Sequence, residues 1–326
     1  MPRTIVAALL AFGAWWTAGE WADQTDDAMD VSSFSVKLAG GRSLEVSVSG
    51  PQQATPLVFH HGTPSERTQY QPLAEAAAAR GLRLVSYSRP GYGGSSRKPG
   101  RTIADCVADT LAIVEQLGAD RFYTAGWSGG GPHALACAAL LSDRVLACAT
   151  IAGVGPFGAA GLDFLEGMGQ ENQEEFGAAL AGPSELQAYL ERQAQVLAEV
   201  TGEQVAAALG DLVSPVDLGA LTDDFAAYLA TTFRRAVSAG IWGWFDDDLA
   251  FTRPWGFALD AVGVPVVVWQ GGQDRMVPFT HGQWLTTHVP AVRPRLLPDE
   301  GHLSIAVASF GKILDELLED RPPVGE

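Results

Sequence analysis

The sequence predicts an α/β protein in which a mostly parallel, doubly wound sheet carries an inserted helical cap. Three patterns lead to this prediction: short continuous apolar runs, helix-length segments between them, and one long stretch with helical patterning alone. Continuous apolar runs are typical of strands buried on both faces, as in a parallel sheet. The runs predicted as strands are residues 57–59, 82–87, 122–125, 145–151 and 264–269.

An antiparallel hairpin is expected before the first of these strands. Residues 34–38 and 44–48 alternate apolar and polar side chains, and Ala39, Gly40 and Gly41 supply a turn between them. Such alternation indicates a hairpin with one exposed face.

Helices are expected between the buried strands. Strand and helix in alternation imply right-handed crossovers with helices on both faces of the sheet. The segments predicted as helices are residues 72–80, 103–117, 133–141, 280–288 and 304–319.

The chain divides into three parts on this pattern. Residues 31–153 and 256–326 are expected to form the α/β core, and residues 154–255 a helical cap. Residues 1–30 are an N-terminal extension. A cap inserted between two strands lies over their carboxyl ends, where ligands bind in open α/β sheets.

Composition and charge limit the partners. Hydrophobic residues make up 47% and charged residues 18% of the chain, which argues against disorder. The 38 acidic and 21 basic residues give a net charge of −17, which repels polyanions. We therefore expect a neutral or cationic small-molecule substrate, no nucleic acid and no stable membrane insertion. A homo-oligomer is compatible with the composition.

The N-terminus leaves the location of the protein open between two alternatives. Residues 5–16 are apolar and follow Arg3, as in a short secretory segment, but the stretch is too short to span a bilayer comfortably. Met29 is an alternative start of translation, so residues 1–28 need not belong to the mature protein. Secretion is the alternative to a cytoplasmic location if residues 1–20 act as a signal peptide.

The cysteines favour a reducing compartment and therefore the cytoplasmic alternative. Cys106, Cys137 and Cys148 cannot all pair, and their spacing matches no zinc or redox motif. We expect them to be reduced.

The motif Gly126-Trp127-Ser128-Gly129-Gly130 is the strongest chemical signal in the sequence. It follows a predicted strand and precedes a predicted helix, which is the context of a nucleophile elbow. The sharp turn strains the backbone of the serine, and only small neighbours permit it. Ser128 is therefore the predicted nucleophile.

A base and an orienting acid follow Ser128 in the chain order that this arrangement requires. A serine hydroxyl is a weak nucleophile unless a base removes its proton and a third group fixes the base. Asp274 follows the predicted strand 264–269, and His302 follows a short strand near residues 295–297. These two residues are the predicted acid and base. The alternatives for the acid are Asp260, Asp299 and the run Asp246, Asp247 and Asp248.

The oxyanion donors are expected from two backbone N–H groups. The loop His60-His61-Gly62-Thr63-Pro64 follows the predicted strand 57–59, and its glycine lets the backbone approach a substrate. The N–H groups of Thr63 and Gly129 are the predicted donors. We expect His61 to hold the loop rather than to transfer a proton.

These motifs resemble those of the α/β-hydrolase superfamily, over a match from about Phe34 to the end of the chain. Within it the chain resembles capped bacterial hydrolases of the epoxide hydrolase, haloperoxidase and proline iminopeptidase branches. Epoxide hydrolases and haloalkane dehalogenases carry an Asp at the elbow, so Ser128 argues against both activities. Ser88 replaces the usual Asp before the next loop, and the elbow differs from G-G-S-W-G of proline iminopeptidases. The matching segments are H-G-x-P at residues 61–64, residues 89–95, the elbow, G-x-x-D-x-x-V-P at residues 271–278 and G-H at residues 301–302.

The substrate is less well defined than the reaction. Trp127 of the elbow and Trp242, Trp244 and Phe245 of the cap are candidates for a pocket wall, although the cap rings could equally pin the cap to the core. The neighbouring aspartates 246–248 are expected in a solvated loop, and binding of an ammonium group is the alternative.

The sequence therefore predicts a serine esterase-like hydrolase acting on a small ester, amide or related acyl substrate, through an acyl-enzyme and without cofactor or metal. The alternatives are a ligand-sensing protein that retains the pocket and a cofactor-free perhydrolase. The identity of the substrate remains open.

Overall fold

The apolar runs of the sequence form one sheet. The computed structural model of the chain describes residues 31–319, and in this range the strand order is β1-β2-β4-β3-β5-β6-β7-β8. The strands are β1 (Ser32–Lys37), β2 (Ser43–Ser49), β3 (Thr55–His60), β4 (Leu82–Tyr87), β5 (Phe122–Trp127), β6 (Val145–Ile151), β7 (Val266–Gly271) and β8 (Val292–Leu297). β1 and β2 form the expected antiparallel hairpin, β2 also pairs antiparallel with β4, and the remaining pairs are parallel.

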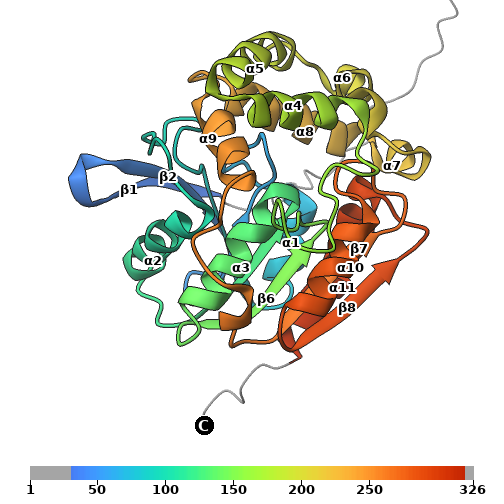
Figure 1. Cartoon of the computed structure of the whole chain (residues 1–326). Helices are drawn as coiled ribbons and strands as arrows, with labels where there is room; N and C mark the ends of the chain where they lie inside the picture. Colours follow the sequence, from blue (N-terminus) through green and yellow to red (C-terminus); the bar gives the residue numbers. More distant parts are fainter. Residues whose placement is uncertain (1–30, 320–326) are drawn as a thin grey trace, which may run out of the picture.

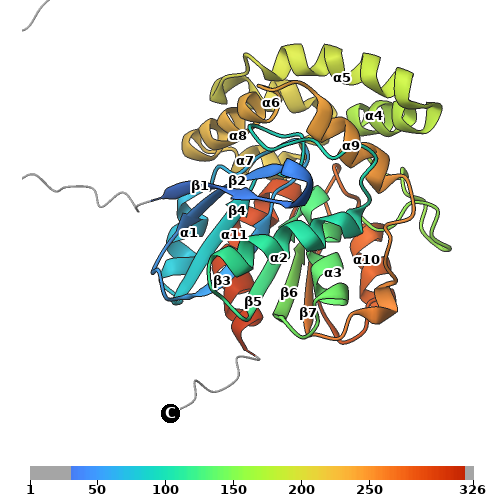
Figure 2. The same cartoon turned by 90° about the vertical axis from the view of Figure 1, so that its left-hand side faces the viewer.

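Helices cover both faces of the sheet, as the alternating pattern predicts. α1 and α11 lie against one face, and α2, α3 and α10 lie against the other (Figure 2). These helices are α1 (Gln71–Ala78), α2 (Cys106–Gln116), α3 (Gly131–Leu140), α10 (Phe279–His288) and α11 (His302–Leu318). The mostly parallel, doubly wound α/β prediction is therefore confirmed.

The segment between β6 and β7 is helical, and it lies over one end of the strands of the sheet (Figure 1). We call residues 154–255 the helical segment. It contains α4 (Gln170–Ala181), α5 (Pro183–Leu197), α6 (Val205–Leu209), α7 (Pro215–Ala220), α8 (Asp223–Ala236) and α9 (Trp242–Phe251). Side chains of α8 and α9 join those of the sheet in one continuous apolar cluster.

Most element boundaries lie one to three residues away from the sequence prediction, and two of these differences have a clear physical reason. β7 begins at Val266 rather than at residue 264, since Pro265 has no N–H to donate to a neighbouring strand. α11 begins at His302 rather than at residue 304, because a carboxylate from elsewhere in the chain accepts the first N–H groups of the helix. His302 is therefore a buried first residue of a helix.

The sequence predictions for the N-terminus concern residues that the structure does not describe. The N-terminal extension, with its alternatives of a signal segment or a later start, lies outside the described residues. None of the helices in residues 31–319 combines the length and apolar character needed to cross a membrane. Cys106, Cys137 and Cys148 are buried and unpaired, as expected.

Candidate active site

Ser128 lies on a strained turn between β5 and α3. Its φ is +56°, which is unusual for a residue with a side chain and costs about 1–3 kcal/mol. The glycines on either side permit the turn: a Cβ atom at Gly126 would collide with the carbonyl of Gly130, and one at Gly130 would collide with that of His60. The strand-to-helix turn expected at the elbow is thus present, with Ser128 half-buried.

The structure brings Asp274 and His302 together. His302 Nδ1 lies 2.8 Å from Asp274 Oδ2, and both side chains are buried. Asp274 follows β7, and His302 follows β8 as the first residue of α11. The strands are parallel, so their carboxyl ends share the edge of the sheet at which β5 delivers Ser128.

Four groups hold the carboxylate of Asp274. Oδ1 accepts the N–H groups of Met276 and Val277, each at 2.8 Å, and Oδ2 accepts the side-chain amide of Gln270 in addition to facing the imidazole. Burial raises the pKa of Asp274, while the contact with His302 and the N–H of Val277 act in the opposite direction. The carboxylate is therefore fixed in orientation and suited to fixing the imidazole.

The two predicted oxyanion residues are neighbours. A Cβ atom at Gly129 would lie 2.6 Å from Thr63 Oγ1, and one at Gly62 would lie 3.3 Å from Ser128 Cβ. The loop after β3 thus packs against the elbow, and the missing side chains let the two backbones approach.

His61 holds this loop, as expected. Its Nδ1 donates to the carbonyl of Gly62 at 2.7 Å, and its Nε2 accepts the N–H of Arg89 at 3.3 Å. Burial, together with the charge of Arg89, holds the pKa of His61 well below its usual value. A neutral imidazole satisfies both contacts.

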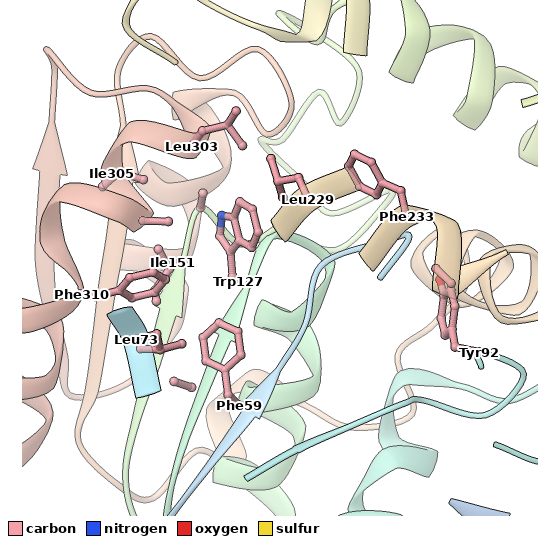
Figure 3. Close-up of a cluster of buried hydrophobic side chains, with 14 of the residues drawn as sticks. Phe59, Leu73, Tyr92, Trp127, Ile151, Leu229, Phe233, Leu303, Ile305 and Phe310 are labelled. Carbon is pink, nitrogen blue, oxygen red and sulfur yellow. The ribbon is translucent and has the colours of Figure 1, made fainter. Parts of the chain in front are cut away.

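Ser128 and His302 line one cavity of about 130 Å³ between the sheet edge and the helical segment. Thr63 and Trp127 line it from the core, and Trp244 lines it from α9. Trp127 packs in the apolar cluster near Leu303 of α11 and Leu229 of α8 (Figure 3). Its indole N–H also donates to the carbonyl of His302 at 3.3 Å, so it helps to hold the histidine backbone.

The other two rings of the helical segment predicted for the pocket wall lie elsewhere. Trp242 stacks on the guanidinium of Arg97, 4.0 Å from the ring centre, and Phe245 packs in the apolar cluster. Neither residue lines the cavity that contains Ser128, so of the three predicted rings in the helical segment only Trp244 lines it.

The expectation of a solvated aspartate loop is wrong. Asp246, Asp247 and Asp248 lie on α9, and each is at most 2% exposed. Cationic partners explain the burial of the first two: Asp246 pairs with Arg97 at 2.8 Å, and Asp247 pairs with Arg89 at 2.6 Å.

Asp247 ties the helical segment to the loop that contains Thr63. Its Oδ2 accepts hydrogen bonds from Thr63 Oγ1 at 2.9 Å and from Tyr92 at 2.8 Å, and its Oδ1 meets Arg101 at 2.5 Å. Arg89 contacts both the helical segment and this loop, because it pairs with Asp247 and its Nη2 also donates to the carbonyl of Gly62 at 3.0 Å. Burial alone would raise the pKa of Asp247, but the charges of Arg101 and Arg89 hold it well below the usual range.

Asp217 of α7 ties the helical segment to His302. Its two oxygens accept the backbone N–H groups of His302, Leu303 and Ser304 at 3.0, 2.7 and 2.9 Å. Ser214 Oγ donates to the same carboxylate at 2.8 Å, and Asp217 is fully buried. A carboxylate at a helix N-terminus offsets the partial positive charge of the unpaired N–H groups.

Sequence reasoning missed the contacts of both connecting aspartates, although Asp217 carries a partial signal. Ser214-Pro215 followed by Asp217 has the form of a helix-capping sequence, which predicts where α7 starts but not which helix Asp217 contacts. Of the alternative acids, Asp260 lies on a short 3-10 turn before β7, and it is Asp274 that contacts His302. In residues 31–319, no cluster of three or more His, Cys, Asp or Glu side chains is placed to hold a metal ion.

Comparison with known proteins identifies a family. Residues 55–308 match the family described as alpha/beta hydrolase fold. The chain is 31% identical to epoxide hydrolase B of Mycobacterium tuberculosis over 170 residues, which are 49% of this chain and 47% of that protein. The match thus spans about half of that relative's length. A bifunctional esterase/perhydrolase of Acinetobacter calcoaceticus is 24% identical over 71% of this chain and 78% of its own.

A solved structure supports the same fold. Bromoperoxidase from Bacillus anthracis superimposes with a TM-score of 0.67 at 22% identity, covering 88% of this chain and all of its own.

Proposed function

Because the chain belongs to the α/β-hydrolase fold family, we propose that it is a serine hydrolase that cleaves a small ester, amide or related acyl substrate. The observation that carries this proposal is the placement of Ser128 on a positive-φ turn in the same cavity as His302, whose ring contacts Asp274. The names of the relatives have only hydrolysis in common. For this chain we propose a more specific reaction, acyl transfer to Ser128.

The proposed reaction begins with proton transfer from Ser128 to His302. As Oγ attacks the substrate carbonyl carbon, His302 Nε2 takes the hydroxyl proton, and Asp274 holds the opposite ring nitrogen and stabilises the imidazolium. The developing negative charge on the carbonyl oxygen meets the N–H groups of Gly129 and Thr63. This stabilisation is strongest in the transition state, where the charge is largest.

The second half of the reaction releases the acid. The leaving alcohol or amine takes the proton from His302, and Ser128 is left as an acyl ester. Water then gives a proton to His302 and its oxygen to the acyl carbon, and Ser128 regains its proton as the ester breaks. Every proton and oxygen is supplied by substrate, water and these side chains, so the proposed chemistry uses no metal or organic cofactor.

The helical segment is proposed to act as a cap over this reaction. α4, α5, α8 and α9 contribute side chains to the cavity opposite Ser128, including Glu175, Tyr189, Phe233 and Trp244. Enclosing the site limits access of bulk water and strengthens the electrostatic contacts inside it.

An epoxide-opening reaction is less well supported than acyl transfer. Epoxide hydrolases resemble this chain but carry an Asp at the elbow, where this chain has Ser128. A hydroxyl attacks carbonyl carbon readily when an imidazole takes its proton, whereas the carboxylate attacks the epoxide directly.

A serine substitution tests the proposal. Replacement of Ser128 by alanine is expected to lower kcat on 4-nitrophenyl esters of acetate to octanoate by at least about a thousandfold. Ser142→Ala, an exposed serine after α3, is the matched control and should turn over as the native protein does. Full activity of the Ser128→Ala protein would exclude the proposed nucleophile. A native protein that binds these esters without turnover would favour the ligand-sensing alternative.

Perhydrolysis is a second candidate function, favoured by the similarity to the bifunctional esterase/perhydrolase. In this reaction hydrogen peroxide replaces water in attacking the acyl-enzyme, and the products are a peroxy acid and free Ser128. Turnover of acetate and hydrogen peroxide to peroxyacetic acid, absent in Ser128→Ala, would establish it.

A further inference from the structure

Three consecutive aspartates of α9 have different partners. Asp246 pairs with Arg97, and Asp247 pairs with Arg89 and Arg101. Asp248 is as deeply buried as these two, at 0% exposed, yet neither of its oxygens has a hydrogen-bond donor among the described residues. A buried carboxylate without a donor or a cation is costly, so this position needs an explanation.

The side chain that Asp248 meets is another carboxyl group, that of Glu175 on α4. Burial, followed by the charges of Glu175 and Asp247, raises the pKa of Asp248 well above its usual range. Burial also raises the pKa of Glu175, to about 7. Asp248 is buried and Glu175 is half-buried, and two adjacent carboxyl groups held away from bulk water share a proton, because both ionise at once only at high cost. The pair therefore carries at most one negative charge near neutral pH, and Arg101 does not balance it because Arg101 is already bound to Asp247.

Glu175 connects this charge to the cavity that contains Ser128. The residue lines the cavity, and its Oε1 accepts the indole N–H of Trp244 at 2.8 Å. Its remaining oxygen is left for Asp248 or for a ligand. Glu171, the other carboxylate on the wall, already accepts the N–H of Asp211 at 3.1 Å.

The rest of the wall suits a cation. Aromatic side chains line the cavity among aliphatic ones, and two of them, Trp244 and Tyr189, belong to the side on which Glu175 lies. No lysine or arginine is among the residues that line it. Aromatic faces and a carboxylate attract an ammonium group and have no preference for an anion.

We propose that this cavity binds a substrate that carries a protonated amine, with Glu175 accepting an ammonium N–H, Asp248 sharing a proton with Glu175 behind it, and Trp244 and Tyr189 flanking the cation. The substrate class is then an amino-functional ester or amide, with the amine directed toward α4 and α9 and the scissile carbonyl toward Ser128. This inference rests on the proposed function for which bond is cleaved, but the binding of the cation does not require cleavage.

The test separates binding from turnover by using the Ser128→Ala protein. Its affinity is measured calorimetrically for n-pentylammonium and for 1-pentanol, two ligands of similar length that differ in charge. The ammonium is expected to bind at least about tenfold more tightly, the effect of one charged hydrogen bond. Equal affinity of the Ser128→Ala protein for the two ligands would overturn the proposal, since the side chains proposed to hold the cation are unchanged in it.

Two substitutions locate the cation. Adding Glu175→Gln keeps an oxygen for Trp244 and should weaken ammonium binding at least about tenfold while leaving pentanol binding unchanged. Asp248→Asn, also isosteric, keeps a neutral hydrogen-bond donor next to Glu175 and leaves the negative charge there, so ammonium binding should be at least as tight as in the parent protein. Glu174→Gln is the matched control, because Glu174 neighbours Glu175 on α4 but is exposed and lies outside the cavity wall. Native-like ammonium affinity in a folded Glu175→Gln protein, or a tenfold loss of affinity in Asp248→Asn, would contradict the proposal.

Turnover supplies the link to the proposed function. The intact protein should hydrolyse 4-nitrophenyl 6-aminohexanoate with a kcat/KM at least about tenfold above that for the hexanoate ester, and Glu175→Gln should remove this preference. If neither ester is hydrolysed, the proposed function fails, while the titrations still decide whether the cavity binds a cation. If both are hydrolysed equally well, the amine preference alone is wrong.

Discussion

Two buried aspartates fasten the helical segment to the carboxyl edge of the sheet, and they are stabilised in different ways. Asp247 of α9 is surrounded by Arg89 and Arg101 and holds the loop of Thr63. Asp217 of α7 accepts three backbone N–H groups at the start of α11, beginning with that of His302. One carboxylate is neutralised by formal charges, and the other is stabilised by the aligned dipoles of a helix start.

Because of this difference, we expect Asp247 to contribute mainly to the stability of the fold and Asp217 to contribute mainly to the position of His302. Removing Asp247 leaves two buried arginines without their counter-ion, which is a large energetic penalty. Removing Asp217 leaves only neutral N–H groups unsatisfied, which costs less, but one of those groups belongs to the proposed catalytic base. The two contacts therefore make separable predictions for stability and for turnover.

The largest effect on stability is expected at Asp247. Asp247→Asn should lower the free energy of unfolding by about 3–5 kcal/mol at pH 7, since it breaks a buried ion pair. Urea denaturation of the native and variant proteins measures the difference. Asp246→Asn is the control and should cost less, because its partner Arg97 is 29% exposed. Equal losses in the two variants would contradict the special role of Asp247.

The same variant has a defined pH dependence. The pKa of Asp247 is depressed in the folded protein below its ordinary value of 3.8, so its contribution to stability is fully present above that pH. The contribution is lost as the pH falls toward the lower, folded-state pKa. The difference between native and Asp247→Asn proteins should thus be constant from about pH 5 to 8 and should shrink below about pH 4. A difference that grows on acidification would contradict this electrostatic account.

A smaller loss of stability with a larger loss of turnover is expected at Asp217. In the native protein three backbone N–H groups share the two carboxylate oxygens of Asp217, whereas an asparagine side chain offers them only one oxygen. Asp217→Asn should therefore lower the free energy of unfolding by about 1.5–3 kcal/mol. Displacement of His302 should lower kcat by about tenfold to a hundredfold with little change in KM. Asp223→Asn, an exposed aspartate at the start of α8, is the matched control. Unchanged kcat in a destabilised Asp217→Asn protein would reduce Asp217 to a structural residue.

The smallest effect is expected at Thr63, the point at which Asp247 reaches the site. Thr63→Val removes the hydroxyl that bonds Asp247 and Arg89 but keeps the backbone N–H. We expect kcat/KM to fall about three- to tenfold and the free energy of unfolding to fall by about 1 kcal/mol. Thr63→Ser restores the hydroxyl and should restore both quantities, whereas an equally impaired serine variant would show that the hydroxyl does not matter.

The comparison also explains which features the sequence predicts. The sheet, its flanking helices and the order of Ser128, Asp274 and His302 follow from local patterns, because each strand is a continuous apolar run and each residue stands directly after a strand. Parallel strands then bring those positions to one edge without any long-range information. The conformation of Ser128 is likewise encoded locally, by the glycines around it.

The contacts of the helical segment are not encoded in this way. A run of three aspartates is usually solvated, and what makes burial tolerable here is the arrival of Arg89, Arg97 and Arg101 from a distant part of the chain. Asp217 and His302 are 85 residues apart, and no local pattern joins them. The cavity wall depends on such contacts too, so the sequence could name Trp244 as a candidate but could not separate it from Trp242 and Phe245.

The identity of the nucleophile is tested most directly by covalent labelling. A fluorophosphonate probe should modify the native protein at a single site, and peptide mass spectrometry should place the label on Ser128. Labelling should be absent in Ser128→Ala and at least about a hundredfold slower in His302→Ala, where no base takes the proton. A label found on another residue, or labelling of Ser128 at the native rate without His302, would contradict the account.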